Sequence, residues 1–270
     1  MSNIRPIKHI QFRKARLGAG ALAVILGLAM AWTQAAYAQE NKPMNQTPAS
    51  ALSASNILSA HQQAIVPIAA FAAAGDMAKL DASLNQGLDA SMTVSDAREI
   101  LVQLYAYAGF PRSLNALGEL MKVLEARKQR GIQDAPGREP SRPIPKGDAL
   151  LAAGTANQTK LSGGPVQGPL FDFAPTANEY LRTHLFGDIF ERDNLDWQSR
   201  ELATVGMLSA LPGAESQLQA HMRISMNVGI TAGQLRQLTQ VLSSRVDAEM
   251  ASRASEALDR HLATLPAGKQ

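Results

Sequence analysis

One carboxylate and one imidazole are spaced so that they could act together. Glu201 lies about ten residues before the turn Leu211-Pro212-Gly213, and His221 lies about eight residues after it. If helices flank this turn and fold back on each other, a rise of 1.5 Å per residue places both side chains roughly 12–16 Å from the turn. We therefore expect Glu201 and His221 to be able to meet across the helix pair.

The chemistry of such a pair has two interpretations. A carboxylate beside an imidazole fixes its tautomer and raises its basicity, which makes a proton shuttle near neutral pH. A buried histidine that is satisfied by a structural glutamate would show the same spacing, so both interpretations stay open. A metal site is not expected, because the histidines lie far apart with no His-x-x-x-His pair: His61, His184, His221 and His261.

The elements that must position this pair are helices. From Ser53 onward apolar residues recur at three- and four-residue spacing, and strand-like alternation is scarce. The sequence predicts an all-α fold with helices at about 54–74, 76–88, 94–108 and 112–130, and then at about 174–186, 196–211, 214–228, 231–246 and 248–263. The stretch between the two sets, 131–173, is rich in Gly and Pro and predicts an irregular linker.

The two helical sets resemble each other at an offset of 138 residues. When Gln62–Leu104 is aligned with Arg200–Leu242, seven of the 43 positions are identical. The glycines at helix breaks (Gly75 and Gly213) and the threonines that start helices (Thr93 and Thr231) fall in register. This register favours a tandem duplication, with one repeat at 54–130 and the other at 174–263.

The N-terminal segment has the pattern of an export signal. Five basic residues and no acidic ones precede or flank an apolar run of about 16 residues, and Ala36-Tyr37-Ala38 offers a cleavage site. The sequence predicts a signal peptide at 1–38, a flexible leader at 39–53 and a periplasmic mature protein. An uncleaved membrane anchor is the alternative, although the apolar run is short for a span of roughly 20 residues.

Charge and cysteine content exclude several function classes. The net charge of +3 comes from the signal segment, since residues 39–270 hold 21 basic and 23 acidic residues. No Lys/Arg run remains that could follow a phosphate backbone, so nucleic-acid binding is not expected. The chain has no cysteine, which excludes disulfides, thiolate metal sites and thiol chemistry.

The second helical set resembles the carboxymuconolactone decarboxylase family, whose superfamily includes the alkylhydroperoxidase D proteins. The resemblance rests on His184-Leu-Phe-Gly-Asp-Ile-Phe-Glu-Arg192, Arg200-Glu201-Leu-Ala-Thr, Gln217-Leu-Gln-Ala-His221 and Asn227-Val-Gly229-Ile-Thr231. The first set is similar through Gly87-Leu-Asp-Ala-Ser-Met-Thr93 and Tyr105-Ala-Tyr-Ala-Gly-Phe-Pro-Arg112. The resemblance implies two alkylhydroperoxidase D-like helical domains, and its single-domain members commonly form trimers or hexamers.

The sequence departs from the peroxidase members of this superfamily. Those members carry Cys-x-x-Cys with a histidine four residues after the second cysteine. Counting back from His221 places these positions at Gln217 and Ala214. Because peroxide reduction there needs a thiolate that cycles through a disulfide, the resemblance does not imply a peroxidase.

The resemblance implies a carboxy-lyase that acts on a small carboxylic acid or lactone without a metal or organic cofactor. Arg192 and Arg200 could anchor a substrate carboxylate in a two-pronged fashion, although each could instead form a surface or intersubunit ion pair. At the 138-residue offset, the first set has Gln63 and Ser83 in place of Glu201 and His221.

The first set in turn has an aromatic and cationic group that the second lacks. Tyr105, Tyr107 and Arg112 could form one wall of a composite site, or the tyrosines could be ordinary core or interface residues. We expect an exported lyase with His221 and Glu201 as its proton shuttle, assembled as a trimer whose six repeats imitate a hexamer. The alternatives are a non-catalytic member that binds a small ligand and a helical assembly module.

Overall fold

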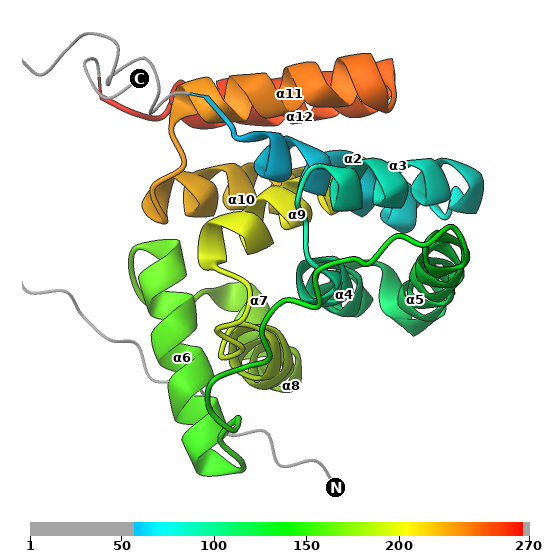
Figure 1. Cartoon of the computed structure of the whole chain (residues 1–270). Coiled ribbons are helices and arrows are strands. Elements are labelled where there is room, and N and C mark those ends of the chain that lie inside the picture. The colour runs from blue at the N-terminus through cyan, green and yellow to red at the C-terminus, as the bar shows by residue number, and fades with distance from the viewer. Residues whose placement is uncertain (1–56, 267–270) are drawn as a thin grey trace, which may run out of the picture. The chain divides into compact units, whose positions relative to one another are not determined.

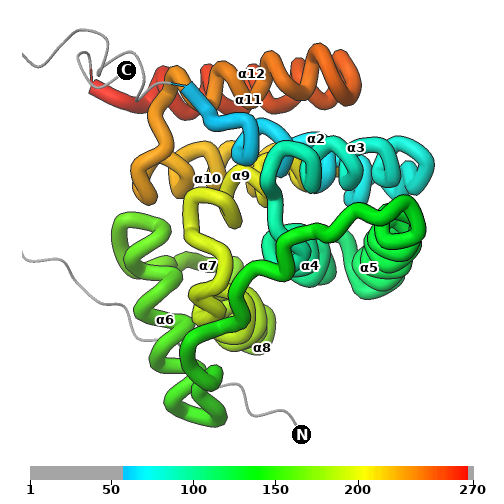
Figure 2. Tube along the Cα trace, viewed as in Figure 1, coloured from blue at the N-terminus to red at the C-terminus, as the bar shows by residue number. Residues whose placement is uncertain are grey.

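The computed structural model describes residues 57–266, which fall within one compact unit of the chain, 47–270. The predicted signal peptide (1–38) and leader (39–53) lie outside the described residues. The regular elements within 57–266 are all helices, so the predicted all-α class is confirmed (Figures 1 and 2).

The described helices form three groups along the chain. The first group is α2 (Ala60–Ala74), α3 (Met77–Asp89), α4 (Val94–Gln103) and α5 (Tyr105–Gln129). The middle group is α6 (Asp148–Ser162), α7 (Pro169–Phe173), α8 (Pro175–Tyr180) and the π-helix η1 (Leu181–Ile189). The last group is α9 (Trp197–Ser209), α10 (Glu215–Asn227), α11 (Ala232–Arg245) and α12 (Ala248–Leu262).

The first and last groups have the same kinds of residues at corresponding helix ends, namely a glycine at a turn and a threonine at an N-cap. Gly75 and Gly213 have φ of 80° and 88°, a backbone conformation that glycine adopts without a steric cost, and each ends a turn between two helices. Thr93 and Thr231 each form a capping box, which satisfies backbone N–H groups at the first turn of α4 and α11. Helices α3 and α10 therefore begin and end 138 residues apart.

The two groups share one hydrophobic core. Helix α2 packs along α9, and both lie at the centre of the described unit (Figure 1). A Cβ atom on Gly206 of α9 would lie 2.9 Å from the carbonyl oxygen of Val66, so the close approach of the two helices requires glycine. The matching helix groups thus pack together in one unit, and their description as two tandem domains stays a prediction. Their origin by duplication stays a proposal.

The prediction of an irregular linker at 131–173 was wrong for its second half. Helix α6 occupies Asp148–Ser162 and packs on η1, and the short helix α7 follows. A Cβ atom on Gly154 would overlap the carbonyl oxygen of Arg182, so this packing also depends on a glycine. The predicted helix at 174–186 is divided between α8 and η1.

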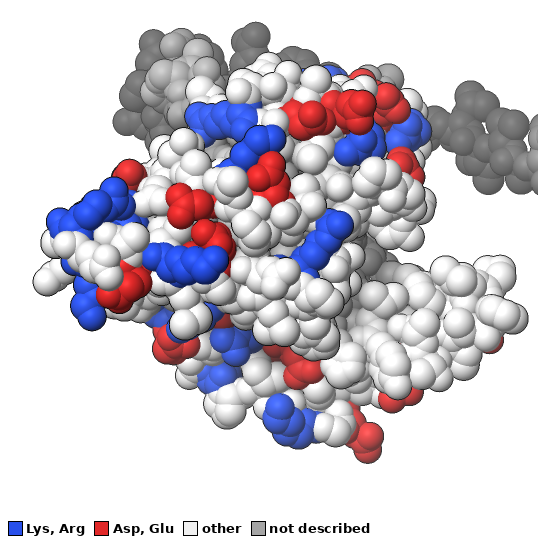
Figure 3. Space-filling view, turned by 90° about the vertical axis from the view of Figure 1, so that its right-hand side faces the viewer, with Lys and Arg blue, Asp and Glu red and all other residues white. Residues whose placement is uncertain are grey.

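The surface of the described unit carries both signs of charge. On the face in Figure 3, Lys and Arg side chains are interspersed with Asp and Glu. Helices that combine the length and the apolar character needed for a membrane span do not occur within residues 57–266.

Candidate functional site

The pair of Glu201 and His221 is positioned by two helices that fold back on each other. Helix α9 starts at its N-cap Asp196, which accepts a hydrogen bond from the backbone N–H of Ser199, and buries nearly its whole length. Helix α10 returns along α9 after the Gly213 turn. His221 Nδ1 lies 2.7 Å from Glu201 Oε2, so the structure brings the two predicted residues into direct contact.

The burial of the pair directs its chemistry to one side of the imidazole ring. Glu201 is fully buried, and its Oε1 atom has no hydrogen-bond partner. The side chain of His221 keeps 9% of its surface exposed. When Glu201 is ionised it accepts the Nδ1 proton, which leaves Nε2 as the nitrogen that can exchange a proton with a ligand or with water.

Tyr107 from α5 completes the surroundings of His221. Its ring meets the imidazole edge-on, with the ring centroids 5.7 Å apart. Its hydroxyl lies 3.2 Å from Thr204 Oγ1, which also accepts a hydrogen bond of 2.7 Å from Gln103 Nε2. Burial and the charge of Glu201 raise the pKa of Tyr107, so the group stays a neutral phenol. One residue of the predicted aromatic wall is therefore at the site.

The other predicted wall residues, Tyr105 and Arg112, form no hydrogen bond, ion pair or ring contact with the pair within residues 57–266, although Tyr105 and Tyr107 pack against the same apolar cluster. Tyr105 stacks on Phe110 with ring centroids 4.6 Å apart and packs against a cluster of apolar side chains: Leu161, Leu185, Phe186, Ile189, Phe190 and Ile224. Arg112 follows the kink that Gly109 makes in α5 (φ 81°) and forms no ion pair within residues 57–266. The contacts of these two residues do not involve His221 or Glu201.

The predicted carboxylate anchors, Arg192 and Arg200, both bind a glutamate of the protein itself. Arg192 holds Glu99 through Nε at 2.9 Å and Nη2 at 2.6 Å, and Arg200 Nη2 lies 3.0 Å from the same carboxylate. Arg200 also donates to the carbonyl oxygen of Arg192 at 2.8 Å and is fully buried. The structure thus corrects the role of Arg200, whose guanidinium stabilises the fold and is inaccessible to a ligand.

Glu99 is a residue that sequence reasoning missed. It is 1% exposed on α4. Burial acts to raise its pKa, but the hydrogen bond from Arg192 and the charge of Arg200 lower it to about 2. The available signal was an acid directly before the apolar run Ile100-Leu101-Val102, because a buried carboxylate needs a cationic partner. Its partners are Arg200 of α9 and Arg192 of the segment before α9, and this long-range pairing is not visible in the sequence.

The position that matches the Glu201–His221 pair in the first group holds a small cavity. Its volume is about 130 Å³, and its lining includes Gln63, Ser83 and Arg245. Arg245 Nη2 lies 3.2 Å from Gln63 Oε1. Neither Gln63 nor Ser83 titrates, so an acid–base pair is present in the second group and replaced by neutral polar groups in the first.

Comparison with known proteins identifies the segment that carries this pair. Residues 175–260 match the model of the carboxymuconolactone decarboxylase family. This segment is therefore similar to that family. A similar relative is a 4-carboxymuconolactone decarboxylase from Acinetobacter baylyi, which is 32% identical over 69 residues, or 26% of this chain. The aligned segment spans about half (51%) of the length of that relative.

The family segment includes α9, α10 and both residues of the acid–base pair. Tyr107 and Glu99, in contrast, come from the part of the chain before this segment. Clusters of three metal-binding side chains were not found among residues 57–266. The chain as a whole has no cysteine, so the thiol chemistry of the peroxidase members of the superfamily has no nucleophile here.

Proposed function

We propose that this chain is a carboxymuconolactone decarboxylase-like carboxy-lyase that acts on a small carboxylic acid or lactone without a metal or organic cofactor. One observation carries the proposal: His221 Nδ1 contacts the buried Glu201 Oε2 at 2.7 Å while 9% of the His221 side chain stays exposed. The family of the segment that holds the pair, and the name of the Acinetobacter baylyi relative, support the reaction class.

The proposed reaction moves one proton to carbon. The bond between the substrate carbon and its carboxylate breaks, carbon dioxide leaves, and the electron pair delocalises into the neighbouring carbonyl of the acid or lactone. Protonated His221 then donates its Nε2 proton to that carbon and takes a new proton from water at its exposed edge. Glu201 holds the ring in place and stabilises its protonated form.

Tyr107 and the remaining cations have supporting roles in this proposal. The neutral phenol ring of Tyr107 fixes one face of the imidazole and excludes water from it. Since Arg200 is buried against Glu99, the substrate carboxylate must be held by more accessible groups. Arg112 is one candidate that remains from the sequence. The other is Arg192, whose side chain is 29% exposed and whose Nη1 is left over after Nε and Nη2 bind Glu99.

The proposal also includes export and assembly. The pattern of 1–38 supports a cleaved signal peptide and a periplasmic protein. The match between the helix groups supports a trimer in which six similar units take the place of six single-domain chains.

Carbon dioxide release is the direct test of the lyase proposal. Purified protein is incubated with 4-carboxymuconolactone and related small lactone acids in deuterated water, and both carbon dioxide and deuterium at the product carbon are measured. We expect turnover by the wild type and its loss in His221→Asn. The control is His184→Asn, because His184 Nδ1 also contacts a carboxylate, Asp188, at 3.2 Å but is exposed.

A second candidate function is that of a helical assembly module in which the acid–base pair is only a structural hydrogen bond. It is favoured by the packing at the pair, since His221 lines none of the cavities around Thr155, Gly118, Ser216 and Ala60. A wild type that neither binds a lactone acid nor releases carbon dioxide, while His221→Asn lowers its stability, would establish this function in place of catalysis.

A further inference from the structure

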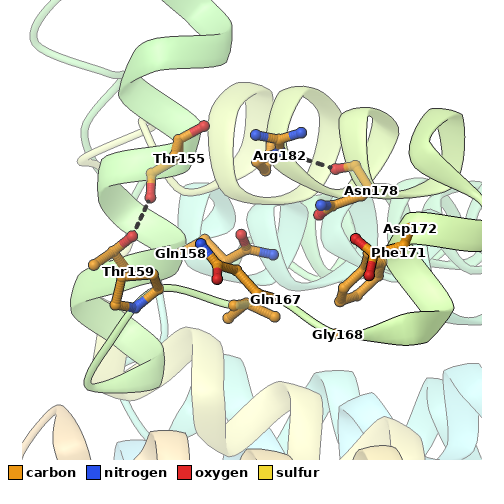
Figure 4. A pocket seen from close by; sticks show the side chains of 11 residues that line it. Thr155, Gln158, Thr159, Gln167, Gly168, Phe171, Asp172, Asn178 and Arg182 are labelled. Atoms are coloured by element: carbon orange, nitrogen blue, oxygen red, sulfur yellow. Dashed lines mark hydrogen bonds between the residues drawn. The ribbon is translucent and has the colours of Figure 1, made fainter. Parts of the chain in front are cut away.

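A second, larger cavity lies away from the acid–base pair. It has a volume of about 620 Å³ and is enclosed by α6, η1, α8 and the segment 165–172 (Figure 4). This volume is within the range of pockets that bind small molecules. Arg182, one of the lining residues, belongs to the π-helix η1, a conformation that occurs frequently at functional sites. The cavity is independent of the function proposed above.

Two polar side chains of the lining are suited to bind a ligand. Gln158 is only 4% exposed, and its carboxamide points into the cavity. Figure 4 draws the hydrogen bonds among the lining side chains, and none of them joins Gln158. Asn178 Oδ1 is also buried and has no hydrogen-bond partner. Buried polar atoms in folded proteins are nearly always paired, so Asn178 Oδ1, with the carboxamide of Gln158 in the same lining, points to a ligand that pairs it.

The hydroxyl groups of the lining are set to accept hydrogen bonds. Thr155 donates its hydroxyl proton to the carbonyl oxygen of Leu151 at 2.7 Å, and Thr159 donates to that of Thr155 at 2.8 Å. Each Oγ1 atom therefore offers only lone pairs to the cavity. Together with Asn178 Oδ1, they form a set of acceptors that a ligand rich in hydroxyl groups would satisfy.

The charges of the lining favour an uncharged ligand. Arg182 is part of the lining and contributes one positive charge, and its Nε donates to the carbonyl oxygen of Asn178 at 3.3 Å. Asp172 supplies one negative charge to the same lining, so the two charges balance. Phe171 adds an aromatic surface on which the apolar face of a sugar ring can stack.

We propose that this cavity binds a neutral polyhydroxylated molecule the size of one or two sugar rings. Its hydroxyl groups donate to Thr155, Thr159 and Asn178, and accept from Gln158 and Arg182. The ligand is held through its hydroxyl groups and its ring face.

The test is saturation-transfer NMR and titration calorimetry on the purified full chain. The probes are the neutral sugars glucose, galactose, xylose and sucrose at millimolar concentration, with acetate and succinate as anionic comparisons. We expect at least one sugar to bind and neither anion to do so. Gln158→Leu should abolish binding, and Thr159→Val should weaken it roughly three- to tenfold through the loss of one hydrogen bond.

The control is Thr183→Val on η1, because Thr183 makes the same kind of bond, to the carbonyl oxygen of Glu179 at 2.8 Å, outside the cavity lining. It should bind the sugar like the wild type. If Gln158→Leu does not fold, Thr159→Val decides the result. The proposal is overturned if no neutral sugar binds, if the anions bind instead, or if Thr159→Val and Thr183→Val have equal affinity.

Discussion

Removing the Glu99 carboxylate should destabilise the protein strongly, because two arginines depend on it. Glu99 is 1% exposed and Arg200 is fully buried, so Glu99→Gln leaves a buried guanidinium without a counter-charge. Breaking a buried ion pair from one side costs about 3–5 kcal/mol. The lowering of the pKa of Glu99 from 4.5 to about 2 corresponds to about 3 kcal/mol, which agrees with that range.

The ion pairs of Glu99 make the stability of the protein depend on pH between about 2 and 4.5. The pKa of Glu99 is lower in the folded than in the unfolded chain, so its contribution is fully present above pH 4.5 and is lost as the pH falls toward 2. Urea unfolding should show Glu99→Gln less stable than the wild type by about 3 kcal/mol at pH 7. The difference in the free energy of unfolding between the wild type and Glu99→Gln should become steadily smaller as the pH falls below 4.5.

The neighbouring residue provides a matched control for this experiment. Arg98 pairs with Glu139 at the surface, where both side chains are well exposed. Arg98→Ala should therefore cost at most about 1 kcal/mol. If Glu99→Gln is no more destabilising than Arg98→Ala, or if its effect is the same at pH 7 and pH 3, the assignment of Arg200 to a structural ion pair is wrong.

Three further predictions concern packing, chemistry and assembly. Gly206→Ala should destabilise the protein by about 1–3 kcal/mol, because the added Cβ would meet the backbone of α2. Gly118→Ala should not destabilise it, because there is open space around Gly118. Thermal unfolding of both variants checks this prediction. Purified protein should show no dithiol-dependent peroxide reduction, because the chain has no cysteine, and robust turnover would refute this. Light scattering should give the mass of a trimer at micromolar concentration, and a monomer would reject the proposed six-unit assembly.

Helical periodicity and break residues predicted most of the fold. The turn at Gly213 and the cap at Thr231 mark the two ends of the segment that forms α10. The fold-back at Gly213 brings α10 against α9, and this places His221 beside Glu201. Helix α6 was missed because Asp148–Ser162 lies between Gly/Pro-rich stretches and contains Gly154. That glycine weakens the helical signal but is required by the packing on η1.

Long-range partners were beyond the reach of sequence patterns. Arg200 and a substrate-binding arginine look alike in sequence, and the difference lies in Glu99, which is 101 residues away. Tyr107 was expected in a composite wall together with Tyr105 and Arg112. Its individual contact with His221 depends on how α5 packs beside α9 and α10, which no local spacing encodes.

The most direct test of the central claim is a double-mutant cycle on the acid–base pair. Carbon dioxide release is measured for the wild type, His221→Asn, Glu201→Gln and the double variant, with Ser83→Ala as the control from the matching position. If the two residues act as one proton relay, each single change should reduce the rate by roughly 10²–10⁴-fold. The double variant should be little slower than the single variants, because residues that act as a unit are not additive. A His221→Asn protein that turns over substrate at the wild-type rate, or losses that simply multiply in the double variant, would contradict the account.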